Sequence, residues 1–85
     1  MRFIRFDPDG WDEFTGWNNR DRKVWLRIVE LLNEVQRNPF SGKGKPEPLK
    51  HQYKGYWSRR ITDEHRLIYK VTDEDITVIS CVGHY

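Results

Sequence analysis

A segment rich in glycine, proline and lysine, residues 42–51, divides the 85-residue chain into two halves with different hydrophobic patterns. Prolines stand on both sides of Glu47, and each proline fixes its own φ and biases the preceding residue toward extended geometry. Because Lys45 and Glu47 both precede a proline, we expect the segment to run extended and stiff. It is either a basic connecting loop or a support that holds Glu47, the one carboxylate among its lysines, in a fixed position.

The half before this segment opens with a short strand and a helix. Residues 2–6 have the composition of a strand, and the Asp, Pro and Gly residues at positions 7–10 predict a turn after it. Aromatic residues then recur at helical spacing, which predicts a first helix over residues 11–19. Asp7 or Asp9 can cap this helix, because a carboxylate accepts hydrogen bonds from the free N–H groups of a first turn.

A second predicted helix has the most regular pattern in the chain. Its apolar residues follow the spacing i, i+4, i+7, i+8 and i+11: Val24, Ile28, Leu31, Leu32 and Val35. Asp21 can cap its start, and Asn38-Pro39 ends it. The short link between the helices predicts an antiparallel hairpin, with the apolar and aromatic stripes forming core.

The half after the segment has the pattern of β-strands separated by short turns. Three strands are predicted, over residues 56–62, 65–71 and 76–82. Turns this short favour an antiparallel meander, with one face packed on the helices and the other left for solvent or a ligand. The sequence therefore predicts a single α+β domain, residues 1–85. We expect an N-terminal strand and an antiparallel two-helix hairpin packed on an antiparallel β-sheet.

Several classes of site and location are disfavoured by the composition. Cys81 is the single cysteine and cannot form an internal disulfide. The three histidines, His51, His65 and His84, lack the spacing of a metal site, so we expect no metal and no cofactor. The chain begins without the apolar region of a signal peptide and has no run long enough to span a membrane. The expected location is the cytoplasm.

Positive charge is concentrated in the middle of the chain. Residues 1–40 carry seven basic and seven acidic side chains, residues 41–70 carry eight and three, and residues 71–85 carry none and three. The local surplus of +5 is either a solvated charged surface or a surface for an anionic partner on the sheet side.

Three arginines, Arg59, Arg60 and Arg66, lie on the first two predicted strands of the meander. Side chains alternate along a strand, so Arg59 and Arg60 point to opposite faces. A two-residue turn at Asp63-Glu64 would place Arg59 beside Arg66, whereas a three-residue bulged loop would place Arg60 there. The residues alone leave this open. In either case two guanidinium groups can converge on one face, or they can form weak surface salt bridges.

One reaction suits the side chains that remain, the metal-independent cleavage of RNA through its own 2′-hydroxyl. It needs a base, cations that stabilise the phosphorane, and an acid for the leaving oxygen. Glu47 fits the base, Arg66 the cation and His84 the acid, while Tyr85 can stack on a base or orient the phosphate. These four are the predicted catalytic residues, although terminal residues such as the last two are usually frayed. The predicted RNA-binding residues are Lys45, Lys50, Arg59 and Arg60.

Several motifs resemble those of one known family, in matching order along essentially the whole chain. They are residues 38–40 (Asn-Pro-Phe), 42–51, 57–62 (Trp-Ser-Arg-Arg-Ile-Thr), 64–67 (Glu-His-Arg-Leu) with Tyr69, and the terminal His84-Tyr85. The chain thereby resembles the YoeB (Txe) toxins of bacterial type II toxin–antitoxin systems, within the RelE/ParE superfamily.

This resemblance implies a microbial-RNase-like α/β fold and an endoribonuclease that cleaves mRNA in the A site of the 70S ribosome. It implies the same roles for Glu47, Arg66 and His84, with Tyr85 aligning the substrate. It further implies that Lys50 and Arg60 line the site, which favours the bulged loop.

The implied partners are mRNA, the ribosome with its rRNA, and a YefM-like antitoxin. In the toxin–antitoxin complex, the contacts to operator DNA are made by the antitoxin. A homodimer is plausible from the many aromatic residues. Two other functions stay open: a non-catalytic ParE-like toxin that blocks a target such as gyrase, and a plain RNA-binding module.

Overall fold

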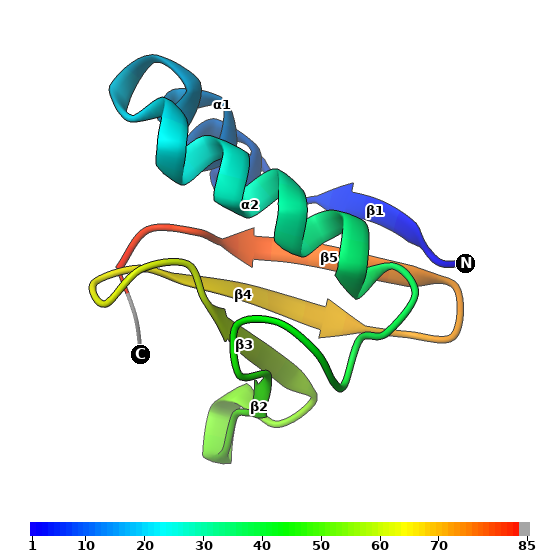
Figure 1. Ribbon diagram of the computed structural model, residues 1–85. Helices are drawn as coiled ribbons and strands as arrows, with labels where there is room; N and C mark the ends of the chain where they lie inside the picture. Colours follow the sequence, from blue (N-terminus) through cyan, green and yellow to red (C-terminus); the bar gives the residue numbers. More distant parts are fainter. Residues whose placement is uncertain (84–85) are drawn as a thin grey trace.

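Two helices cover one face of a five-stranded sheet in the computed structural model, which describes residues 1–83 (Figure 1). The elements, in chain order, are β1 (Phe3–Phe6), α1 (Pro8–Arg20), α2 (Arg22–Val35), β2 (Glu47–Pro48), the 3-10 helix η1 (His51–Tyr53), β3 (Tyr56–Arg60), β4 (Arg66–Val71) and β5 (Asp75–Ser80). The predicted class, a strand and a helical hairpin packed on a sheet, is confirmed. Within residues 1–83, no helix combines the length and apolar character needed to cross a membrane.

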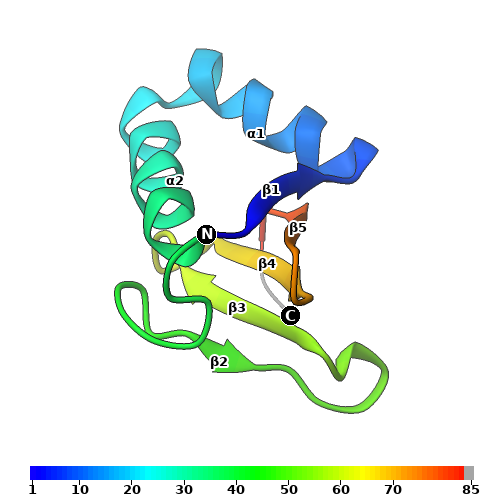
Figure 2. The same cartoon turned by 90° about the vertical axis from the view of Figure 1, so that its right-hand side faces the viewer.

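The sheet is mixed rather than antiparallel throughout. Its strand order is β1-β5-β4-β3-β2, and β1 runs parallel to β5 with Phe3 opposite Asp75, while the other neighbours are antiparallel. The short turns of the meander correctly predicted the antiparallel pairs. They carry no information about which edge the first strand joins, because two helices intervene. Figure 2 shows both helices on the same side of the sheet, so the opposite side, here called the open face, has no helical cover.

The first helix begins three residues before its predicted start. Asp7 is its N-cap and accepts a hydrogen bond from the Gly10 N–H at 2.7 Å, and Pro8 occupies the first turn. The Asp-Pro-Asp-Gly run is therefore a helix start and not a turn, since proline lacks only an N–H that the first turn leaves free. Gly10 is required there, because a Cβ atom would lie 2.5 Å from the carbonyl oxygen of Val78.

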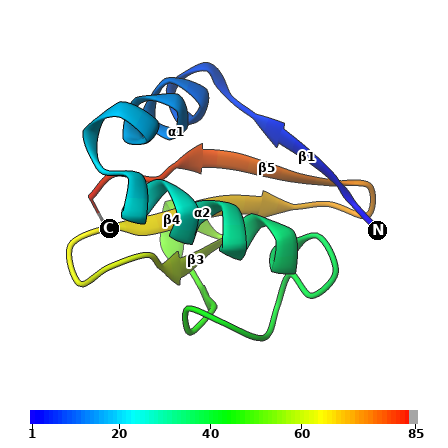
Figure 3. The ribbon, with the colours of Figure 1, turned by 45° about the horizontal axis from the view of Figure 1, so that its top comes forward.

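Asp21 lies between the two helices and caps both of them, as the C-cap of α1 and the N-cap of α2. Its N–H donates to the Trp17 carbonyl at the end of α1, and its carboxylate accepts from the N–H groups of Lys23 and Val24 at the start of α2. The predicted cap is confirmed. With a one-residue link, α2 turns back over the sheet and lies over β4 (Figure 3).

The core lies between the helices and the sheet. Four of the five residues in the predicted stripe of α2 are buried, and Val24 packs against them at the edge. Alternate residues of the strands face them, and these include Leu67, Tyr69, Ile76 and Val78, all 0% exposed. Side chains alternate along each strand, so the residues between those that face the core point to the open face.

Candidate functional site

A cavity of about 200 Å³ lies on the open face where β2, β3 and β4 meet. It is lined by Lys45, Glu47, Leu49, Ser58, Arg60, Arg66 and Ile68. The structure thus brings four predicted site residues together from parts of the chain that are far apart in sequence. One is a carboxylate and three are cations.

The strand register explains how these residues meet. Glu47 is opposite Ser58 in the β2–β3 pair, and Arg60 is opposite Arg66 in the β3–β4 pair. Ser58 and Arg60 are two residues apart and therefore share a face. The register consequently places the carboxylate and both arginines on the open side of neighbouring strands.

The register also decides which arginine accompanies Arg66. The Ile61 N–H donates to the His65 carbonyl at 3.0 Å, which leaves a three-residue loop between them. This loop length places Arg60 beside Arg66, as the family resemblance favoured. The Nη1 atom of Arg66 donates to the carbonyl oxygens of Thr62 at 2.6 Å, Asp63 at 3.1 Å and His65 at 3.2 Å, so the loop itself holds this guanidinium group.

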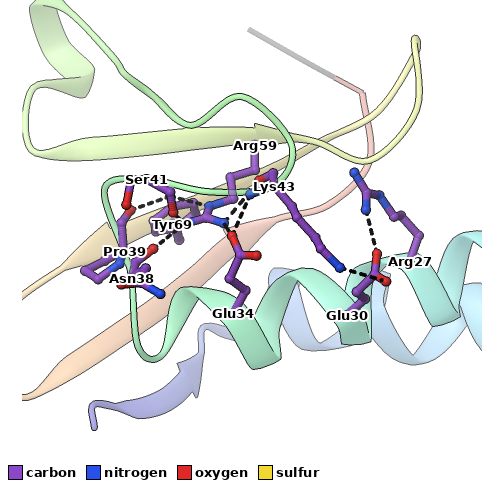
Figure 4. Close-up of polar contacts among 9 residues, drawn as sticks. All are labelled: Arg27, Glu30, Glu34, Asn38, Pro39, Ser41, Lys43, Arg59 and Tyr69. Atoms are coloured by element: carbon purple, nitrogen blue, oxygen red, sulfur yellow. Dashed lines mark hydrogen bonds and ion pairs between the residues drawn. The ribbon is translucent and has the colours of Figure 1, made fainter.

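Arg59 points to the opposite face and must be removed from the predicted RNA-binding residues. Its side chain is 0% exposed, because side chains alternate along β3 and this one points toward the core. All three guanidinium nitrogens donate to protein acceptors, so none is directed at solvent or a ligand (Figure 4).

The partners of Arg59 come from α2, β4 and the loop of residues 38–44. Its acceptors are the carboxylate of Glu34 at 2.6 Å, the hydroxyl of Tyr69 at 3.1 Å, and the carbonyl oxygens of Asn38, Ser41 (2.8 Å) and Lys43 (3.1 Å). Tyr69 in turn donates to the Pro39 carbonyl at 2.7 Å, and the Lys43 N–H donates to Glu34 at 2.6 Å. Sequence reasoning missed this network. One signal for it lay in the sequence: one of two consecutive arginines on a strand must face the core, and a buried arginine needs buried acceptors.

Electrostatics within the network favour the ionised carboxylate. Partial burial opposes ionisation of Glu34, but hydrogen bonds from the Lys43 N–H and from Arg59 outweigh it and lower the pKa of this carboxyl. Burial raises the pKa of Tyr69, and the hydrogen bond from Arg59 offsets only part of that rise. Glu34 is therefore the charged partner, and the Tyr69 hydroxyl stays neutral and acts as both donor and acceptor.

The turn before Glu47 is tighter than expected. Lys45 has a φ of 51°, so it is not extended as predicted, and Gly44 has a φ of 82°. A Cβ at Gly44 would lie 3.0 Å from the Arg60 carbonyl oxygen, which shows how closely the loop approaches β3. The strand β2 begins at Glu47 itself.

The remaining predicted residues have different positions. Lys50 is exposed at the start of η1 and does not line the cavity. His84 and Tyr85 lie outside the described residues. The last described residue, Gly83, accepts a hydrogen bond from the Arg66 N–H at 2.8 Å and donates to Nδ1 of His65 at 2.9 Å. The backbone that leads to His84 is thus tied to the strand that carries Arg66.

The described residues offer neither a metal cluster nor an activated thiol. Among residues 1–83, no group of three or more His, Cys, Asp or Glu side chains could hold a metal ion. Burial raises the pKa of Cys81 to about 12, so its thiol is not a nucleophile at neutral pH. What the cavity does supply is one carboxylate beside guanidinium and ammonium groups, a set suited to a phosphodiester.

The chain matches known proteins over its whole length. Residues 6–85 match a family model described as YoeB-like toxin of bacterial type II toxin-antitoxin system. A protein named Toxin YoeB from Mycobacterium bovis is 53% identical over 85 residues, which are 100% of both chains. Toxin YoeB of Escherichia coli K12 is 49% identical, again over 100% of both chains.

Solved structures agree with the sequence matches. The YoeB/ParE toxin from Agrobacterium tumefaciens superposes with a TM-score of 0.94 at 41% identity, covering 100% of both chains. A Staphylococcus aureus YoeB dimer gives 0.91 at 42% identity, covering 99% of this chain and 98% of that one. A heterotetrameric YoeB–YefM complex from the same organism gives 0.89 at 42% identity, covering 100% and 99%. With its sequence and its fold both matched from end to end, the chain belongs to the YoeB toxin family of bacterial type II toxin–antitoxin systems.

Proposed function

We propose that this protein is a ribosome-dependent mRNA endoribonuclease that cleaves mRNA in the ribosomal A site and so inhibits translation. The observation that carries the proposal is the cavity in which Glu47 meets Arg60 and Arg66. A surface that only binds anions gains nothing from a carboxylate among its cations, whereas general base catalysis requires one. Family membership supports the same reading.

The proposed reaction uses the 2′-hydroxyl of the substrate as its nucleophile. Glu47 takes the proton of that hydroxyl, the 2′-oxygen attacks the adjacent phosphorus, and the 5′-oxygen leaves with a proton from His84. Arg66 stabilises the charge that develops on the phosphorane, and Arg60 binds the same phosphate. The products are a 2′,3′-cyclic phosphate and a free 5′-hydroxyl, and no metal ion is needed in any step.

The assignment of His84 as the acid rests on chain connectivity. Gly83 is hydrogen-bonded through its carbonyl to the Arg66 N–H, and His84 is the next residue. A residue that follows directly has a short reach to the phosphate that Arg66 would bind. Tyr85 is assigned to substrate alignment.

Substrate binding is proposed to be weak without the ribosome. Besides Arg66, only Lys45 and Arg60 are cations among the described residues of the cavity lining, and Lys50 is exposed three residues after Glu47, so the site offers few cations to a free RNA strand. Presentation of the mRNA by the ribosome and its rRNA would supply the missing positioning. This site of action is in the cytoplasm.

The proposed partners follow from the similar structures. A YefM-like antitoxin is proposed to bind and neutralise the protein, since a Staphylococcus aureus YoeB is described in a heterotetrameric complex with YefM. Operator DNA is proposed to be contacted only through that antitoxin. A homodimer is also proposed, because a YoeB dimer is described from the same organism.

Primer extension on one message, with and without translating ribosomes, tests the proposal. Wild type should create new 5′ ends only with ribosomes, and these ends should carry a hydroxyl opposite a 2′,3′-cyclic phosphate, as attack by the 2′-oxygen requires. Glu47→Gln and His84→Ala should each lose about 10²–10⁴-fold in cleavage rate. Ribosome pelleting supplies the control, because both variants should bind as wild type does. Growth arrest without new 5′ ends would favour a non-catalytic toxin, and unchanged cleavage in both variants would remove the assigned roles.

A further inference from the structure

The proposed chemistry makes no use of Arg59, although this residue is the largest fully buried side chain of the described chain. Burying a guanidinium group removes its hydration, and apolar residues of similar volume often stabilise a protein equally well or better. Net stability is therefore a poor explanation for an arginine here. A network of this kind can instead select one conformation among several, because only one arrangement satisfies every donor.

The conformation that Arg59 fixes is that of the loop of residues 38–44. The arginine holds three backbone carbonyls of that loop, at Asn38, Ser41 and Lys43, while Glu34 fixes the Lys43 N–H from the helix side (Figure 4). The loop has no regular structure of its own, and Gly42 and Gly44 both have positive φ values. Without these contacts its backbone would have many alternatives.

The fixed loop leads directly to the proposed base. One residue after Lys43, the Gly44 carbonyl accepts a hydrogen bond from the Arg60 N–H at 2.6 Å. Three residues further on, Glu47 pairs with Ser58. The strand β3 thus holds the segment twice by its backbone and once by the Arg59 side chain. Arg59 and Arg60 are adjacent, so a shift at one is transmitted to the other.

We propose that Arg59, together with Glu34 and Tyr69, is a positioning residue that sets the place of the Glu47 carboxylate relative to Arg60 and Arg66. The inference rests on the proposed function, because it assigns a part in that reaction. It concerns residues on the helix-covered face, which touch neither substrate nor reacting atoms. Disturbing the network should slow the chemical step and leave the binding of programmed ribosomes intact.

Tyr69→Phe is the most informative variant, because it removes one hydroxyl and keeps the aromatic ring in the core. It leaves the Nε of Arg59 and the Pro39 carbonyl without their partner. Arg59→Lys is the second variant, since an ammonium group keeps the charge but cannot reach acceptors in so many directions. Ile76→Val is the matched control: it trims a fully buried core residue in β5, which is two strands away from β3.

Single-turnover cleavage on programmed ribosomes, measured over a range of toxin concentrations, separates the chemical rate from binding. We expect Tyr69→Phe to slow cleavage at saturation by about tenfold and Arg59→Lys by up to about 10²-fold, as for misplaced catalytic groups generally. The concentration for half-saturation should change less than about twofold in both variants. Hydrogen exchange of residues 38–48 should become faster in both and stay unchanged in Ile76→Val.

The outcomes separate the two proposals. Three results would overturn the inference while wild-type cleavage still upheld the function. They are an equal loss of rate in Ile76→Val, unchanged hydrogen exchange in Tyr69→Phe, and a rise in the half-saturating toxin concentration with no change in the rate at saturation. If wild type does not cleave, the proposed function fails. Faster exchange in residues 38–48 of Tyr69→Phe would then still show that the network fixes the loop, and the assignment to catalysis would fall.

Discussion

Arg59 and Arg60 are consecutive residues of β3, yet they lie in opposite environments. Arg59 is 0% exposed on the helix-covered face and donates from every guanidinium nitrogen to protein acceptors. Arg60 is exposed on the open face and lines the cavity that contains Glu47. The two side chains have the same chemistry, so the difference between them comes from strand parity alone.

This difference separates a structural from a functional use of the same residue type. A guanidinium group on the covered face must find acceptors, because an unpaired buried charge is very costly. On the open face water satisfies the donors until a phosphate replaces it. The covered face should therefore respond to substitution through stability and, where the position of Glu47 depends on it, through the cleavage rate. The open face should respond through activity with little change in stability.

The largest expected effect is on the covered face. Glu34→Ala removes the carboxylate that pairs with Arg59 at 2.6 Å and leaves the arginine charge buried without its counter-ion. We expect the free energy of unfolding to fall by about 3–5 kcal/mol. Urea unfolding followed by tryptophan fluorescence would measure it.

An ion pair whose arginine is exposed, unlike Arg59, supplies the control for Glu34→Ala. Arg5 and Asp75 are 3.4 Å apart, and the arginine side chain is 67% exposed. Asp75→Ala should cost no more than about 1 kcal/mol, because solvent screens such pairs. Equal losses in the two variants would show that burial does not distinguish the pairs, and the contrast between the faces would be lost.

The next effect is on the open face. Arg60→Ala keeps the backbone N–H that binds Gly44 and removes only the exposed side chain. Losing a charged hydrogen-bond donor to phosphate should reduce cleavage efficiency by about 10–100-fold. The melting temperature should hardly change, since exposed substitutions usually alter stability by less than about 0.5 kcal/mol.

Lys70→Ala tests whether the effect of Arg60→Ala is specific. Lys70 is an exposed cation on β4, opposite Tyr56 and outside the cavity lining. Cleavage and ribosome pelleting should both stay near wild type. If Lys70→Ala lowered cleavage as much as Arg60→Ala, the open face would act through its overall charge and not through the cavity.

The elements that could be predicted from the sequence are those set by local rules. The apolar stripe of α2, the caps Asp7 and Asp21, and the strands of the meander depend on residues close together in the chain. The pairing of β1 with β5 could not be predicted, because it joins the two ends of the chain. The choice of Arg60 over Arg59 depended on one residue of loop length, which sequence patterns resolve poorly.

The candidate site was partly predictable for a chemical reason. Glu47 and Arg66 belong to a small set of side chains able to assist RNA cleavage, and the cavity contains both. The hydrogen-bond network around Arg59, on the other face of the sheet, could not be predicted from residue type. Glu34 and Arg59 are 25 residues apart, and an acidic residue on an amphipathic helix ordinarily belongs to the solvated side.

The smallest expected effect is a pH dependence of stability that comes from Glu34 on the covered face. The pKa of Glu34 in the folded protein lies below its usual value of 4.5, so the unfolded chain takes up a proton first as the pH falls. The stabilisation is complete above the usual value and is lost as the pH falls through the lowered folded pKa. Glu34→Gln keeps an acceptor but cannot ionise, so its unfolding free energy should fall less steeply than that of wild type between about pH 5 and pH 3.

Glu30 also has a lowered pKa, chiefly through the hydrogen bond from Arg27, but it is exposed. Urea unfolding at high salt screens that contribution, so Glu30→Gln should there follow wild type. Parallel curves for Glu34→Gln and wild type would mean that the carboxylate acts as a neutral acceptor, and that its charge contributes nothing to holding Arg59.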